Sequence, residues 1–424
     1  MTEPPYAVEK TTLTNGVRIV TQRMPQAHSV SMGVWVAAGA RDESPAEGGI
    51  SHFIEHMLFK GTERRDAYQI AKQFDAIGGI SNAFTGMETT CYHAKVLKSH
   101  LATMVDILVD IVLNSVFDAT EVERERPVIC QEIGMVEDAP DEYIHHVAAR
   151  AHWGENPLGR PILGSRENVL GFEPPHLKRF FRRLYTPRRI VISAAGNLTH
   201  RQLVDLTAPA FEALPAGDDF PSREAPAGAR GVTWINRDIE QQHLCLCTQG
   251  IGVTDPRRFA FSLLNSLLGG NMSSRLFQKI RERSGLAYAV YSFASAFSDT
   301  GMFGAYAGIH PDNTPACLDL ILDEFKLLKQ NSISADELQD AKEYTKGNLL
   351  LAAESNDNQM VRLAQNEINF SRHVRLDEVV ARIEAVTIDE IQSLAQALFI
   401  DHPLTLTLLG PLNKVPDLEA KLAL

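Results

Sequence analysis

Cysteine is scarce in this sequence, with five residues in 424, and their odd number and wide spacing exclude a disulfide-stabilised scaffold. The pair in Cys245-Leu246-Cys247 lies in an alternating apolar stretch, which favours a packed strand over a metal site. Long apolar runs are also missing, because no stretch reaches the roughly 18 residues that a membrane-spanning helix needs. Basic residues are outnumbered, and the formal net charge of −12 argues against a nucleic-acid partner.

Targeting signals are absent from the beginning of the chain as well. The segment Met1-Thr2-Glu3-Pro4-Pro5 lacks the basic and apolar regions of a secretory signal, and it is unlike an Arg- and Ser-rich transit peptide. We therefore expect a cytoplasmic protein with no membrane partner, unless a presequence has been removed. The length predicts two or more domains of about 200 residues each.

The segment from Gly49 to Gly61 combines an apolar stripe with a set of metal-binding side chains. Apolar residues recur there at helical spacing, at Ile50, Phe53, Ile54, Met57 and Leu58. His52, Glu55 and His56 fall at i, i+3 and i+4, so the three side chains share one face of the expected helix. Two imidazoles one turn apart can chelate Zn²⁺, and the carboxylate between them can accept a proton from water; this is the H-x-x-E-H order of a class of zinc peptidases. The alternative is an ordinary amphipathic helix with two surface histidines and a solvated glutamate.

The sequence pattern occurs twice along the chain. Val105-Asp106-Ile107-Leu108 returns as Leu318-Asp319-Leu320-Ile321, an offset of 318 − 105 = 213, and Gly196 after its strand matches Gly410, an offset of 214. This repeat predicts an α+β fold of two tandem homologous α/β-sandwich domains, each with a mixed, largely antiparallel sheet and helices packed on one face. We expect an N-terminal zinc-binding domain over residues 1–213, a Pro- and Gly-rich linker over 214–230, and a C-terminal domain over 231–424 without a metal site.

A third metal ligand must come from outside the His-Glu-His helix. Glu132 is a candidate, because Val128, Ile129 and Ile133 flank it, and a carboxylate in an apolar run is expected to be paired or bound to metal. Glu125 lies two turns earlier on the same face, where it could hydrogen-bond a ligand histidine. Spacing alone leaves both assignments open.

The residues from His52 to Thr62, followed by Glu125 and Glu132, resemble the pitrilysin and mitochondrial processing peptidase family of zinc metallopeptidases. In that family the third ligand is a glutamate about eighty residues beyond the first histidine, and here 132 − 52 = 80. The resemblance implies one Zn²⁺ per chain held by His52, His56 and Glu132, with Glu55 as general base. It also implies an assisting role for Glu125.

Two further segments resemble parts of the same family that bind substrate. Ser81-Asn82-Ala83-Phe84-Thr85 is similar to its edge strand, which implies that Asn82, Ala83 and Phe84 contact an extended peptide. The segment from Arg281 to Tyr288 is similar to an Arg-x6-Tyr element, which implies that these two residues contact substrate at the zinc site from the second half. The segment from Leu158 to Gly164 is also family-like. One departure is Pro127, where we expect a kink between Glu125 and Glu132.

The resemblance implies a zinc endopeptidase that hydrolyses extended, unfolded peptides or presequence-like segments inside a closed chamber. Larger members join four such domains in one chain, so this chain is expected to form a homodimer, or a heterodimer with a related chain lacking the zinc motif. Two other functions stay open: a non-catalytic structural or assembly subunit of the same family, and a zinc-binding clamp that holds peptides without cutting them.

Overall fold

A computed structural model describes residues 7–217, 223–330, 333–400, 403–411 and 418–423. The contacts divide the chain into two compact units. The first unit consists of Met1–Gly134, Pro161–Pro221 and Leu351–Val374, and the second of Met135–Arg160, Ser222–Leu350 and Arg375–Leu424. Each unit thus takes a segment from the other half of the sequence. The expected division into 1–213, 214–230 and 231–424 stays a prediction, and residues 218–222 of the expected linker lie outside the described residues.

The first unit is built on a six-stranded sheet. Its strands, in spatial order, are β1 (Val8–Thr12), β2 (Arg18–Arg23), β6 (Ile190–Gly196), β3 (Ser29–Val36), β5 (Thr90–Leu97) and β4 (Ile80–Thr85). β2 and β6 run parallel, and the other neighbouring strands are antiparallel. β2 and β3 are consecutive along the chain, on either side of residues 24–28, but β6 lies between them in the sheet.

The second unit repeats this strand order in a five-stranded sheet. Its strands are β7 (Gly231–Asn236), β11 (Leu404–Gly410), β8 (Gln242–Gly250), β10 (Gly301–Ile309) and β9 (Ala287–Ala296). Again the first pair, β7 and β11, is parallel and the remaining pairs are antiparallel. The expected α+β fold with two mixed, largely antiparallel sheets is confirmed, and β1 is the strand that the first sheet has in addition.

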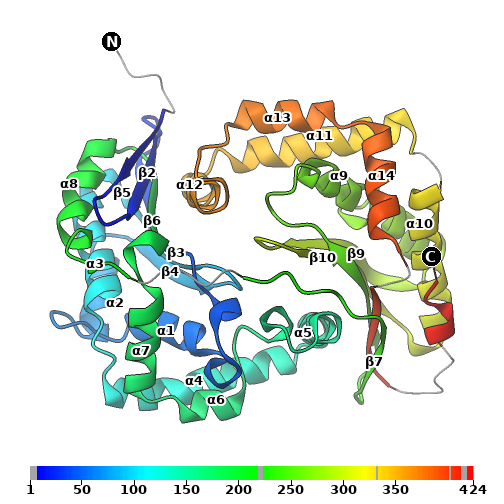
Figure 1. Cartoon of the computed structure of the whole chain (residues 1–424), viewed down its shortest axis with the longest axis horizontal. Coiled ribbons are helices and arrows are strands. Elements are labelled where there is room, and N and C mark those ends of the chain that lie inside the picture. Colours follow the sequence, from blue (N-terminus) through cyan, green and yellow to red (C-terminus); the bar gives the residue numbers. More distant parts are fainter. Residues whose placement is uncertain (1–6, 218–222, 331–332, 401–402, 412–417, 424) are drawn as a thin grey trace. The chain divides into compact units, whose positions relative to one another are not determined.

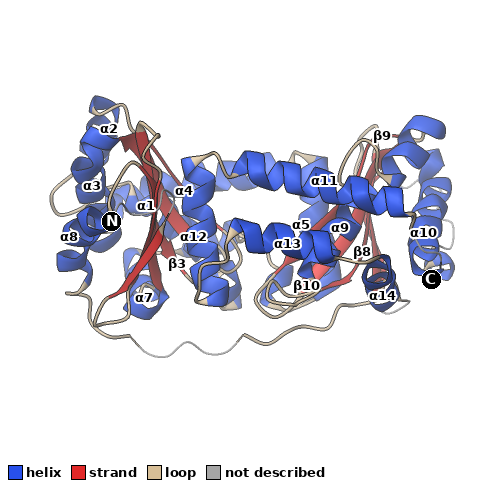
Figure 2. Ribbon diagram, turned by 90° about the horizontal axis from the view of Figure 1, so that it is seen from above, coloured by secondary structure: helices blue, strands red, loops and turns tan. Residues whose placement is uncertain are grey.

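Helices cover both faces of the first sheet, as Figures 1 and 2 show, so the expectation of helices on one face only was wrong for this sheet. Alternate residues of β3 point to opposite sides: Val34 and Val36 join the main core, while Trp35 joins a separate cluster on the other face. Met360 and Leu363, on a helix from the second half of the sequence, belong to that separate cluster. The helices of this unit are α1 (Ile50–Leu58), α2 (Ala67–Ala76), α3 (Leu101–Asn114), α4 (Ala119–Glu137), α6 (Arg166–Gly171), α7 (Pro174–Leu184), α8 (His200–Phe211) and α12 (Asn356–Phe370).

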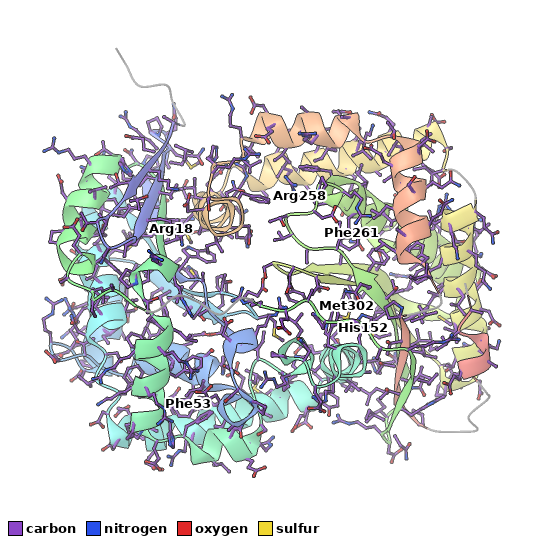
Figure 3. All side chains as sticks on the ribbon, viewed as in Figure 1. Arg18, Phe53, His152, Arg258, Phe261 and Met302 are labelled. Atoms are coloured by element: carbon purple, nitrogen blue, oxygen red, sulfur yellow. The ribbon has the colours of Figure 1, made fainter. Side chains whose placement is uncertain are left out.

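The second sheet carries a helix from the first half of the sequence. On β8, Leu244 and Leu246 join the main core of this unit, while Cys245 on the opposite face lies 3.9 Å from Nδ1 of His145 on α5 (Pro140–Trp153). His152, labelled in Figure 3, lies near the end of α5 and bonds Thr405 of β11 across 3.1 Å. The placement of Cys245 and Cys247 in a strand is thus confirmed.

The remaining helices of the second unit are α9 (Arg258–Gly269), α10 (Thr314–Gln330), α11 (Ala335–Ala352), α13 (Leu376–Ala385) and α14 (Ile388–Leu398). α9 contains neither histidine nor glutamate. Among the described residues, no helix is both long enough and apolar enough to cross a membrane.

Candidate metal centre

The helix that carries the His-Glu-His set begins at a tightly constrained turn. Gly49 precedes α1 with φ = +95°, and a Cβ atom at this position would lie 2.6 Å from the carbonyl oxygen of Leu163. Glycine is therefore required for both backbone conformation and space. The buried carboxylate of Glu43 accepts hydrogen bonds of 2.8 Å from the backbone N–H groups of Gly49 and Ser51. The segment around Leu163 and the carboxylate of Glu43 together fix where α1 begins.

Three side chains from two helices converge beside α1. The Nε2 atoms of His52 and His56 lie 3.6 and 3.5 Å from the same oxygen, Oε2 of Glu132 on α4. The two imidazole rings are 4.6 Å apart between centroids. Among the described residues, this is the group of metal-binding side chains whose ligand atoms all lie within 4.8 Å of one another. The structure therefore brings together the three residues that the sequence predicted as ligands.

The distances and the chemistry of this group fit one zinc ion. For a tetrahedral ion with bonds of about 2.0–2.1 Å, neighbouring ligand atoms are about 3.4 Å apart, close to the separations observed here. Two imidazoles and one glutamate also make up a known catalytic donor set for zinc. Burial, with a further contribution from His56, lowers the pKa of His52 to about 3, so this imidazole is neutral, which is the form that binds zinc.

The two histidines differ in what supports them. Nδ1 of His56 forms a hydrogen bond of 2.8 Å with Oε1 of Glu125, whose other oxygen lies 2.6 Å from Nζ of Lys60. Burial raises the pKa of Glu125, but the hydrogen bonds to His56 and Lys60 outweigh it, and the net pKa lies below the usual range. In contrast, the buried Nδ1 of His52 has no hydrogen-bond partner among the described residues.

Pro127 does not interrupt the helix that carries both glutamates. α4 runs from Ala119 to Glu137 with Pro127 inside it, and both Glu125 and Glu132 reach the histidines. Pro127 lies on the exposed side, where water can satisfy the carbonyl that lacks its usual donor. The helix therefore continues through Pro127, and the kink expected there stays a prediction.

Glu55 lies on the same helix as the histidines and is held from the sheet. The hydroxyl of Thr85, the last residue of β4, donates a hydrogen bond of 2.6 Å to Oε2 of Glu55. Burial raises the pKa of Glu55, and the bond from Thr85 counteracts part of this increase. A carboxylate with a raised pKa is a better proton acceptor.

The predicted substrate-binding residues Asn82, Ala83 and Phe84 lie on β4, at the edge of the first sheet. Within the described chain β4 pairs with β5 on one side, and its other edge is not paired with a strand. Asn82 and Phe84 are exposed, and Phe84 makes an edge-on contact with Trp35. This strand is thus available for pairing with an extended chain.

Arg281 and Tyr288 belong to the second compact unit. Arg281 lies in a π-helical segment, η6 (Phe277–Arg283), and Tyr288 is the second residue of β9. The guanidinium of Arg281 lies 4.7 Å from the ring centroid of Phe277 and 4.9 Å from that of Tyr288. Tyr288 is 79% exposed, which leaves its hydroxyl accessible. Their expected contact with substrate stays a prediction.

Three supporting residues received no role from the sequence: Glu43, Lys60 and Thr85. Lys60 and Thr85 lie inside the two segments that carry the family resemblance, so proximity in sequence was an available signal. Glu43 had no such signal, because its role depends on the folded path of residues 43–51.

Comparison with protein families gives two matches that together span most of the chain. Residues 18–166 match the family described as insulinase (peptidase family M16), and residues 172–344 match the one described as peptidase M16 inactive domain. The first match contains His52, Glu55, His56, Glu125 and Glu132. The second contains Arg281 and Tyr288.

Individual relatives extend the similarity over nearly the whole length. The chain is 40% identical over 410 residues to "Uncharacterized zinc protease YmxG" of Bacillus subtilis, covering 97% of this chain and 100% of the relative. It is 39% identical to an uncharacterized zinc protease of Streptomyces coelicolor, covering 96% and 90%. A solved protease from Helicobacter pylori has the same fold, with a TM-score of 0.89 at 21% identity and coverage of 96% and 100%. A second solved structure, described as a peptidase M16 inactive domain from Pseudomonas fluorescens, gives a TM-score of 0.89 at 20% identity, covering 95% and 98%.

Proposed function

The chain belongs to the insulinase family of peptidases, family M16, and on that premise we propose that it is a zinc-dependent endopeptidase. The observation that carries the proposal is the convergence of His52, His56 and Glu132 at distances suited to one ion, with Glu55 on the same helix. His52, His56 and Glu132 hold the zinc, one per chain. When bound, the metal supplies Lewis-acid activation of water and of the scissile carbonyl.

The remaining chemistry is assigned to side chains of this protein. Glu55 accepts the proton of the attacking water and passes it to the leaving amine, which its burial and raised pKa favour. Thr85 holds the carboxylate of Glu55 in one orientation. Glu125 keeps the ring of His56 oriented through Nδ1, an assisting role rather than one of direct contact with substrate.

The substrate is an extended, unfolded peptide or a presequence-like segment. Its main chain pairs with the open edge of β4 at Asn82 and Ala83, and Phe84 contacts a neighbouring side chain of the peptide. Strand pairing recognises main chain more than side chains, which favours unfolded segments over folded proteins. Arg281 holds the peptide backbone, and the hydroxyl of Tyr288 stabilises the developing oxyanion.

A homodimer completes the closed chamber in this proposal, because the chain has two α+β repeats and larger relatives have four. Both the zinc set and the Arg281/Tyr288 element are present in one chain, so a partner lacking the zinc motif is not needed. Light scattering tests this assembly: an active, stable monomer would contradict it.

A quenched-peptide assay with the Glu55→Gln variant tests the catalytic assignment. We expect the wild type to cleave unstructured peptides, to lose activity with o-phenanthroline and to regain it with added zinc. Glu55→Gln should retain zinc and lose activity by about 10²–10⁴-fold, because only the proton acceptor is removed. Bound zinc without cleavage in the wild type would instead support the clamp function or the assembly-subunit function. Residues 172–344 match a family described as an inactive domain, so the assay must also be able to detect the assembly-subunit function.

A further inference from the structure

Lys60 forms the outer end of a chain of contacts that leads to one zinc ligand. Its Nζ lies 2.6 Å from Oε2 of Glu125, and Oε1 of the same carboxylate lies 2.8 Å from Nδ1 of His56. The Glu125 side chain is 5% exposed and that of Lys60 is 31% exposed. One buried carboxylate is therefore shared between a cation and a ligand histidine.

The two contacts of Glu125 define the direction of its carboxylate. A buried carboxylate oxygen without a donor is costly, so a carboxylate that loses Lys60 would turn to find another partner for Oε2. Such a rotation moves Oε1 away from Nδ1 of His56. The contact with Lys60 and the hydrogen bond with His56 thus act on the same carboxylate.

His56 has a hydrogen-bonded support that the neighbouring ligand His52 lacks within the described part of the chain. Nδ1 of His52 has no hydrogen-bond partner among the described residues, whereas Nδ1 of His56 has Glu125. A hydrogen bond at one ring nitrogen fixes the ring plane and leaves the other nitrogen directed at the metal. In His56, that other nitrogen is Nε2, which lies 3.5 Å from Glu132.

We propose that Lys60 is a positioning residue for the metal centre: through Glu125 it fixes the orientation of His56 and so sets the affinity for zinc. This inference rests on the proposed zinc site and adds a residue that touches neither metal nor substrate. Lys60 lies two residues after the end of α1 at Leu58, and from there its side chain reaches Glu125 on α4.

The test is zinc affinity, measured by competition with a chromophoric chelator at fixed pH. Lys60→Met should weaken zinc binding by about 10-fold or more, within the range found when the partner of a ligand is removed. Lys60→Arg keeps a cation and should recover most of the affinity.

The matched control is Lys421→Met. Lys421 also bonds a carboxylate across 2.6 Å, that of Asp319, and its side chain is 34% exposed, but it belongs to the second unit. This variant should bind zinc as the wild type does. Unfolding of the metal-free variants separates a loss of affinity from a loss of fold.

A double-mutant cycle with Glu125→Gln decides whether Lys60 acts through Glu125. If it does, Lys60→Met should have little additional effect in the Glu125→Gln background. Wild-type affinity in Lys60→Met, or an equal loss with and without Glu125, would overturn the inference while leaving the zinc site intact. A wild-type protein that binds no zinc would overturn both the inference and the proposed function.

Discussion

The hydroxyl of Thr85 donates a hydrogen bond of 2.6 Å to Oε2 of Glu55, which joins the end of β4 to the helix that carries the metal-binding histidines. β4 is the strand that we assign to the substrate, and Glu55 is the group that we assign to proton transfer. The two functions are therefore connected through a single side chain. A peptide that pairs with β4 comes to lie next to the residue that orients the general base.

Replacing Thr85 by valine removes this hydrogen bond at nearly constant shape. We expect Thr85→Val to lower kcat by about 10-fold, because Glu55 loses the donor that holds its carboxylate, while zinc content stays unchanged. Peptide assays and metal analysis measure the two effects. Thr89→Val is the control: Thr89 lies in the adjacent turn, where its backbone carbonyl accepts a hydrogen bond from Gly86. Equal kcat values for the two variants would contradict the positioning role of Thr85.

The ionised form of Glu55 should destabilise the metal-free protein at neutral pH. Burial raises the pKa of Glu55 above its ordinary value of 4.5, so folding favours the protonated form. The associated stability is fully present below pH 4.5 and is lost as the pH rises through the raised pKa. Glu55→Gln removes this dependence, and we expect it to be more stable than the wild type at pH 7 and similar to it near pH 4.5. Urea unfolding at the two pH values measures the difference; an equal gap at both would contradict the prediction.

His52 should make the metal-free protein sensitive to acid. Burial lowers its pKa from 6.5 to about 3, so the folded state favours the neutral ring. Its contribution to stability is present above pH 6.5 and is lost as the pH falls toward 3. His152 acts in the same direction, since burial lowers its pKa to about 4. Because both histidines contribute to the acid sensitivity, the contribution of His52 is measured as the difference in pH dependence between the wild type and a His52 variant.

For this comparison, urea midpoints of the wild type and His52→Gln are measured between pH 7.5 and 4.5. The wild type should lose more stability over this range than His52→Gln. His28→Gln, which changes an exposed histidine, should follow the wild type. If His52→Gln and the wild type showed the same pH dependence, the neutral buried state of His52 would be disproved.

The metal-binding set was predictable because most of its information is local. The spacing of His52, Glu55 and His56 depends on helix geometry alone, and the apolar stripe of α1 fixes which face is buried. Placing Glu132 required knowledge of how α4 packs against α1, which the family resemblance supplied. The contacts of Thr85 and Lys60 depend on hydrogen-bond geometry between elements, so the sequence assigned them no role.

The exchange of helices between the two halves was not predictable in the same way. Amphipathic patterns in α5 and α12 indicate that each helix has a buried face, but not which sheet that face covers. In the structure Arg18 of β2, labelled in Figure 3, lies 3.6 Å from Glu367 of α12. Lys10 of β1 lies 2.6 Å from the same carboxylate. Contacts across more than 300 residues of sequence are determined by tertiary packing, which periodicity does not report.

The packing of α12 on the first sheet should contribute measurably to stability. Met360 is 1% exposed and lies in the cluster formed with Trp35 and Cys91, on the sheet face opposite the main core. A Cβ atom added at Gly33 would approach the sulfur of Met360 to 2.7 Å, which shows how closely the helix contacts the strand.

Met360→Ala should lower the free energy of unfolding by about 2–5 kcal/mol, because it leaves a cavity between helix and sheet. Met272→Ala, at a methionine that is 74% exposed, should change it by less than about 0.5 kcal/mol. Equal stability of the two variants in urea unfolding would show that α12 is not packed on the first sheet in solution.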